Sequence, residues 1–273
     1  MKFKYLIITF CVIIISVLLA TILLPMIVSG QSILVNLRII SLPLMILMSL
    51  LLISLSVFFI LNYKLLSLLE REDWPALAYY LEQKIFVKGR YNSRNVRILA
   101  SSYLVISDYQ SVLKLESKSQ IAKPSVISKN VLIFGAARIL NGMHDDTAVF
   151  YRLHLEKCAK KDKQWVRWFY GFSSLLSGNY NQAETEFASL AVSSGDSLIS
   201  GLSAYFLASS LGKKTSNPEK CRNSSEQGKI KVIKALKNLN GWKKETDKLK
   251  NEVHTAIIKR YLEETGNWLF GNG

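Results

Sequence analysis

The sequence predicts an all-α protein, with a transmembrane helical hairpin followed by an α-solenoid of paired helices and a C-terminal capping helix. Two observations predict the hairpin, because the chain carries no charged side chain from Tyr5 to Leu37 and none from Ile39 to Tyr63. A third observation predicts the solenoid. Pairs of positions that suit a close helix contact and a turn, seven residues apart, recur every 34 to 36 residues.

The charge-free runs predict a membrane anchor over residues 1–62. Each run exceeds the roughly 20 apolar residues that cross a bilayer, so we expect spans at about 6–28 and about 39–61. Pro25 and Pro43 stand near the ends of these spans, where a missing helical hydrogen bond costs least. A cleaved signal peptide is the alternative for the first span, although its apolar core is longer than the 7–15 residues typical of signals.

The charges at the N-terminus predict which way the anchor is oriented. Lys2 and Lys4 precede the first span, and basic residues are retained on the cytoplasmic side. Two spans return the chain to that side, as does one span after cleavage. We therefore expect a multi-pass protein of a bacterial inner (cytoplasmic) membrane, with the repeat domain facing the cytoplasm.

The stretch 164–191 carries the clearest repeat signal. A small residue, a turn glycine, an aromatic residue, an alanine and a second aromatic residue follow one another there, at Gly171, Gly178, Tyr180, Ala183 and Phe187. Small residues let two helices approach closely, and the aromatic side chains fill the space beside them. This stretch resembles one tetratricopeptide repeat (TPR), which implies two antiparallel helices.

The same spacing predicts about five TPR-like units over residues 63–240, since one repeat cannot bury its apolar face alone. The paired positions are Leu65/Glu72, Ala100/Ser107, Gly135/Gly142, Gly171/Gly178 and Tyr205/Gly212. Tyr205 departs from the small residue expected there, which leaves the register of the fifth unit open. An irregular helical bundle is the alternative architecture.

Three further elements follow from local signals. The second span runs into residues 64–69 without glycine or proline, so the first repeat helix continues the membrane helix, and Trp74-Pro75 begins its partner. Gly212–Gly228 is rich in Ser, Asn and Lys and predicts a loop. Trp242–Thr265 carries an apolar stripe and predicts one final helix, so that residues 241–273 form a capping helix and tail.

The sequence contains none of the local patterns of catalytic or metal chemistry that we sought. It has no glycine-rich phosphate loop, no nucleophile elbow and no zinc-ligand spacing. The histidines, at 144, 154 and 254, lie far apart, and Cys11, Cys158 and Cys221 have no metal-binding spacing, although a Cys158–Cys221 disulfide is an open alternative. We therefore expect no enzymatic activity, no cofactor and no metal.

Net charge points to possible partners. The formal charge is +15, from 35 basic and 20 acidic residues, and Lys229–Arg260 alone holds ten basic and three acidic residues. We interpret the excess first as a solvated face and second as a surface for anionic lipid headgroups. Nucleic acid is the least favoured partner, because aromatic residues do not interleave with these lysines.

The resemblance to TPR proteins implies a concave groove lined by the first helix of each repeat. In this register the groove is basic at one end and aromatic at the other, and its candidate partner-binding residues are Arg94, Arg97, Lys129, Trp165, Trp168, Phe172 and Phe206. We expect a membrane-anchored scaffold or assembly factor that binds a protein partner there. In one alternative the terminal helix occupies the groove. In another the protein is a basic surface module for anionic lipid or nucleic acid.

Overall fold

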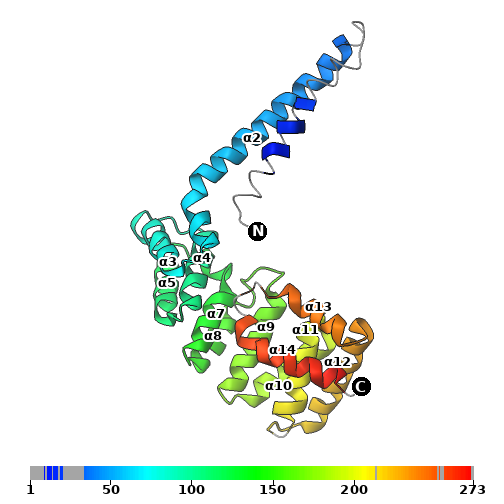
Figure 1. Ribbon diagram of the computed structural model, residues 1–273. Helices are drawn as coiled ribbons and strands as arrows, with labels where there is room; N and C mark the ends of the chain where they lie inside the picture. The colour runs from blue at the N-terminus through cyan, green and yellow to red at the C-terminus, as the bar shows by residue number, and fades with distance from the viewer. Residues whose placement is uncertain are drawn as a thin grey trace. The chain divides into compact units, whose positions relative to one another are not determined.

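The computed structural model describes residues 9, 11–13, 15–17, 19–20, 34–212, 214–250, 252 and 255–271. Every regular element in this part of the chain is a helix, which confirms the all-α prediction (Figure 1). The chain divides into two compact units, Met1–Tyr80 and Leu81–Gly273. The sequence analysis had placed the end of the anchor at residue 62.

The first unit is dominated by one long helix, α2 (Leu34–Glu70). Its segment Ser49–Glu70 is the one described helix long and apolar enough to cross a membrane, and almost none of it is buried. The second expected span, 39–61, lies within α2, and the helix runs unbroken through residues 64–69 as expected. Most of the first expected span lies outside the described residues. The next helix, α3 (Trp74–Glu82), begins at Trp74, as predicted.

The second unit begins within α3 and contains short and long helices in sequence. They are η1 (Gln83–Val87), α4 (Ser93–Val105), α5 (Tyr109–Ala122), α6 (Ser125–Ser128), α7 (Val131–Leu140), α8 (His144–His154), α9 (Lys163–Leu176), α10 (Tyr180–Ser193), α11 (Ser197–Phe206), η2 (Leu207–Leu211), α12 (Pro218–Leu236), α13 (Leu239–Lys248) and α14 (Thr255–Phe270). η1 and η2 are π-helical turns. Successive long helices pack on one another along the chain: α4 on α5, α5 on α7, α7 on α8, α8 on α9 and α9 on α10.

The same turn ends four of these helices. The second residue after each helix adopts a left-handed conformation, with φ of 55° at Glu72, 59° at Ser107, 76° at Gly142 and 79° at Gly178. The following N–H then bonds to a carbonyl five residues earlier, as Asp108 does to Tyr103 at 2.8 Å and Asn179 does to Ser174 at 2.8 Å. This is the Schellman arrangement, which satisfies the last helical carbonyls. The predicted turn register is confirmed at these four positions.

The fifth turn is different from the other four. Gly212 has a φ of −54° and follows the π-helical turn η2, so the turn at this position lacks the left-handed residue found in the other four. The loop predicted over Gly212–Gly228 is largely wrong, because α12 begins at Pro218. Asn217 caps this helix by accepting a hydrogen bond from the Lys220 N–H at 3.1 Å, and proline suits the first helical position.

The final helix predicted over Trp242–Thr265 is two helices, α13 and α14, and this prediction is corrected. The chain breaks between them, where the Thr255 hydroxyl donates to the Leu249 carbonyl at 2.7 Å. A side chain that bonds the last carbonyls of a helix competes with its continuation. No glycine or proline marks this break in the sequence.

Close helix contacts occur at the small residues of the repeat pattern. A Cβ added to Gly171 would lie 3.1 Å from Phe187 Cε1, and Ala183 is completely buried. On the preceding pair, the ring of Tyr151 lies directly against Gly135. The Glu116 carboxylate of α5 accepts two hydrogen bonds from Arg138 of α7, at 2.9 and 3.1 Å, and so ties neighbouring pairs together. Cys158 and Cys221 are free thiols, so no disulfide joins them.

Candidate partner-binding cleft

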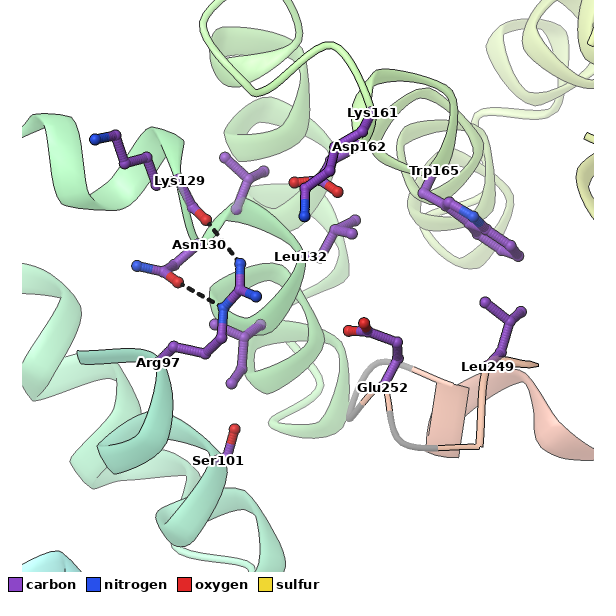
Figure 2. Close-up of a pocket in the computed structure, with 12 residues that line it drawn as sticks. Arg97, Ser101, Lys129, Asn130, Leu132, Lys161, Asp162, Trp165, Leu249 and Glu252 are labelled. Atoms are coloured by element: carbon purple, nitrogen blue, oxygen red, sulfur yellow. Dashed lines mark hydrogen bonds between the residues drawn. The ribbon is translucent and has the colours of Figure 1, made fainter. Parts of the chain in front are cut away.

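The basic end of the expected groove is an open pocket of about 390 Å³ between three helices (Figure 2). Arg97 and Ser101 enter it from α4, Leu132 from α7 and Trp165 from α9. Arg97 and Trp165 are candidate partner-binding residues of the predicted groove. Arg94, by contrast, is exposed on α4 and does not line the pocket.

Arg97 is held in place by the start of α7. Its Nε donates to the Asn130 side-chain oxygen and its Nη2 donates to the Lys129 carbonyl, both at 3.2 Å. Asn130 is buried and donates in turn to the Val126 carbonyl at 2.9 Å and to the Ser93 hydroxyl at 3.1 Å. The guanidinium is therefore fixed at the pocket wall while the Arg97 residue stays exposed.

Lys129 contributes to the pocket differently from the sequence expectation. Figure 2 shows its carbonyl facing Arg97 while its ammonium end points away from Arg97. The second ammonium of the lining belongs to Lys161, which the sequence analysis did not select. Two carboxylates, Asp162 and Glu252, line the same pocket, so its walls carry both signs of charge.

Two helices begin at this pocket without a side-chain cap. The N-cap residues are Asn130 for α7 and Asp162 for α9, and neither side chain bonds to the helix N-terminus. At α4 and α11, by comparison, Asn92 and Asp196 do cap their helices. Uncapped N–H groups and the helix dipole favour negative charge near a helix start. Together with Arg97 and Lys161 they suit an anionic group on a ligand.

A larger pocket, of about 1000 Å³, shares the lining residue Glu252 with the first. Its floor is apolar and comes from α4, α7 and the two C-terminal helices: Leu104, Val105, Leu140, Leu239, Trp242 and Leu262. Its rim is charged and includes Lys243, Asp247, Lys259 and Glu263. We call the two pockets together the cleft. Its lining residues come from α4, α7, the start of α9, and the C-terminal pair α13–α14 with the segment between them.

The aromatic end of the expected groove is closed, which corrects the sequence prediction. Trp168, Phe172 and Phe206 are at most 3% exposed. Their rings pack on one another, with 5.2 Å between the centroids of Trp168 and Phe172 and 5.6 Å between those of Phe172 and Phe206. Tyr261 of α14 covers them, 5.0 Å from Phe206 and 5.7 Å from Phe172. Trp165, 8% exposed, is the one that reaches the open pocket.

Trp242 fixes α13 and α14 in this position. Its indole N–H donates to the Leu262 carbonyl of α14 at 2.9 Å. A Cβ added to Gly201 of α11 or to Gly266 of α14 would lie 2.7 Å from its ring. The indole is thus enclosed by two glycines, and no larger residue fits at either position without a shift. The sequence analysis placed Trp242 on an apolar stripe but had no signal for its glycine partners.

The described residues show no metal-binding cluster, and two of their titratable groups have shifted pKa values. No group of three or more His, Cys, Asp or Glu side chains among them could hold a metal ion. Burial, followed by Lys157 and Arg138, lowers the pKa of His154, and burial raises the pKa of the Cys158 thiol. A thiol with a raised pKa is a weak nucleophile at neutral pH.

Comparison with known proteins places the chain in a family. A family model described as "Uncharacterised Treponema protein" matches residues 111–271, which is more than half of the chain. The chain belongs to this family. The matched region runs from α5 to the end of α14, so the C-terminal pair is part of the family's shared domain, whereas Arg97 precedes it.

A relative from Treponema pallidum (strain Nichols), described as "Uncharacterized protein", is 25% identical over 222 residues. The aligned region covers 79% of this chain and 71% of the relative. No solved structure matches the chain significantly.

Proposed function

We propose that this protein is a membrane-anchored scaffold or assembly factor that binds a segment of a partner protein in the cleft. The observation that carries this proposal is the cleft itself, a charged pocket that shares Glu252 with a larger and more apolar one. In the proposed TPR-like register, the first helix of each repeat lines the ligand groove, and α4 and α7 line this cleft. A fixed Arg97 and two uncapped helix starts suit an acidic side chain. The apolar lining of the larger pocket suits apolar side chains that neighbour this acidic residue in the partner segment.

The proposed architecture is a TPR-like solenoid behind a transmembrane hairpin. The four identical turns and the paired helices support the repeats. The long apolar helix α2 supports the anchor, with Lys2 and Lys4 favouring a cytoplasmic repeat domain in a bacterial inner membrane. Among the candidate residues we retain Arg97, Lys129 and Trp165 as ligand contacts. Trp168, Phe172 and Phe206 instead hold α14 in place.

Two substitutions in the cleft and one outside it test the proposal. Val105 and Leu140 line the apolar pocket and are 51% and 41% exposed, so Val105→Trp and Leu140→Arg should leave the fold intact. Val149 on α8 is similarly exposed, lines neither pocket and supplies the control Val149→Trp. The full chain is purified from its native membrane in mild detergent, and the stably bound protein is identified and titrated.

We expect the two cleft variants to weaken binding of that partner about tenfold or more, because central interface residues dominate affinity. The control should bind as the wild type does. Equal melting temperatures in all three variants would show that folding is unaffected. A partner that binds the cleft variants with wild-type affinity would rule the cleft out as its site.

A further inference from the structure

An exposed apolar site lies among cations at the start of the second unit. Ile121 and Val87 are 87% and 72% exposed, the highest values among the large hydrophobic side chains described in this unit. A cation–π contact joins their two segments, because the Lys118 ammonium lies 4.3 Å from the centroid of the Phe86 ring. Phe86 precedes Val87, and Ile121 follows Lys118 by one helical turn.

Basic residues flank both side chains in the sequence, Lys84, Lys88 and Arg90 near Val87, and Lys118 and Lys123 near Ile121. From Gln83 to Ser107 the chain has five basic residues and no acidic residue. The flanking carboxylates are engaged elsewhere, since Glu82 accepts a hydrogen bond from Tyr103 and Glu116 pairs with Arg138. We call the site the cationic tip. It consists of Val87 and Ile121 with Lys84, Lys88, Arg90, Arg94, Lys118 and Lys123.

The like charges at the tip act on one another. The pKa of Lys84 is lowered, first by partial burial and then by Arg90, Arg94 and Lys88. Each of these cations disfavours the protonated form of Lys84 by repulsion. A surface with this potential is stabilised when it meets negative charge.

We propose that the cationic tip docks on the anionic surface of a lipid bilayer. Exposed aliphatic side chains within a ring of Lys and Arg fit the boundary between headgroups and acyl chains. The position in the chain agrees, because Lys84 follows Glu70, the end of the candidate span, by only 14 residues. This inference uses the membrane anchor of the proposed function but not the cleft.

The test measures whether the tip contacts lipid. The full chain is reconstituted into nanodiscs of phosphatidylcholine alone or with phosphatidylglycerol added. A photo-crosslinking amino acid replaces Val87, or in the control Val149, an exposed valine on α8 that follows Asp145 and Asp146 by one turn. Lipid adducts are counted by intact mass after illumination.

We expect adducts at position 87 in the anionic discs, several-fold fewer in neutral discs or in 0.5 M salt, and few at position 149 in any disc. Lys88→Gln and Arg90→Gln should each reduce the yield at position 87 by about fivefold, the effect of one cation near an anionic surface. Both residues are exposed, so the fold should be unaffected.

Three results would overturn the proposal. The first is an equal number of lipid adducts at positions 87 and 149, and the second is an adduct yield at position 87 that is the same in anionic and neutral discs. The third is loss of the adducts when RNA or an acidic protein is added at physiological salt. Failure of the anchor gives a separate signal, because the chain would then not co-elute with the discs. Partner binding in the cleft should be unchanged by Lys88→Gln and Arg90→Gln.

Discussion

The burial of Trp168 depends on a helix that lies far from it in the sequence. The spacing of Trp165, Trp168 and Phe172 correctly places them on one face of α9. That face could have been an open groove or a packed interface, and the residues of α9 itself do not distinguish the two. The answer lies on α14, about 90 residues later, where Tyr261 covers the cluster. A contact between segments so distant leaves no local signal.

We expect Trp168→Ala to destabilise the protein by about 3–5 kcal/mol, because it removes a fully buried ring and leaves a cavity. Trp268→Ala is the control: this ring is half-buried and contacts Tyr205 and Lys229. It should cost clearly less. Chemical denaturation of the full chain in detergent, followed by near-ultraviolet circular dichroism, measures both. An unchanged denaturation midpoint for Trp168→Ala would return this residue to the list of accessible binding anchors.

At the scale of elements, the regular part of the chain was the predictable part. A turn seven residues after each close-contact position is a local pattern, and it located four left-handed turns. The incorrect element predictions concern segments whose structure depends on more than their local composition. The polar composition of Gly212–Gly228 suggested a loop and outweighed the capping pair Asn217-Pro218, while the break at Leu249 depends on the Thr255 side chain.

The left-handed turns predict opposite changes in the free energy of unfolding for two substitutions. A left-handed backbone costs a residue with a Cβ about 1–2 kcal/mol relative to glycine. Gly178→Ala should therefore lower the free energy of unfolding by about 1 kcal/mol, although nothing lies within 4 Å of the added Cβ. Ser107→Gly should be neutral or stabilising, since it removes the same strain at a cost in unfolded-state entropy.

Equilibrium unfolding of the two variants in parallel gives the comparison. Gly195→Ala supplies a reference, because Gly195 also has open space around it but lacks a positive φ. Destabilisation by Ser107→Gly as large as that by Gly178→Ala would mean that the two turns are not equivalent, and would remove support for the repeat register.

At the scale of the whole molecule, the sequence predicted helices throughout, a long apolar helix and a C-terminal helical element packed on the preceding helices. It did not anticipate where the chain divides. Composition changes at Lys64, where charged residues resume, and this suggested a boundary at residue 62. The helix α2 continues to Glu70, as predicted from residues 64–69, and the compact units separate only after Tyr80. A change in polarity does not end a helix that has no breaking residue.

The proposed topology predicts the location of the C-terminus. Lys2 and Lys4 should hold the N-terminus inside, so two spans place residues 63–273 in the cytoplasm. A fluorescent protein fused after Gly273 should therefore be bright, and an alkaline phosphatase fused there should be inactive. The reverse pair of signals would make this an exported domain. Fusions after Gly30 provide the internal control, with the opposite pattern expected.

Under the proposed function, the closed aromatic end limits the length of the partner segment that the cleft can hold. The larger pocket is lined by α4 and α7 together with α13–α14. Neighbouring helices pack about 8–10 Å apart, so this track is roughly 20 Å long. An extended chain advances about 3.3 Å per residue, which corresponds to roughly six residues of partner. A segment of that length should be sufficient for binding on its own. A peptide of this size should therefore compete with the intact partner. An unrelated carrier protein should acquire binding when the segment is grafted onto it.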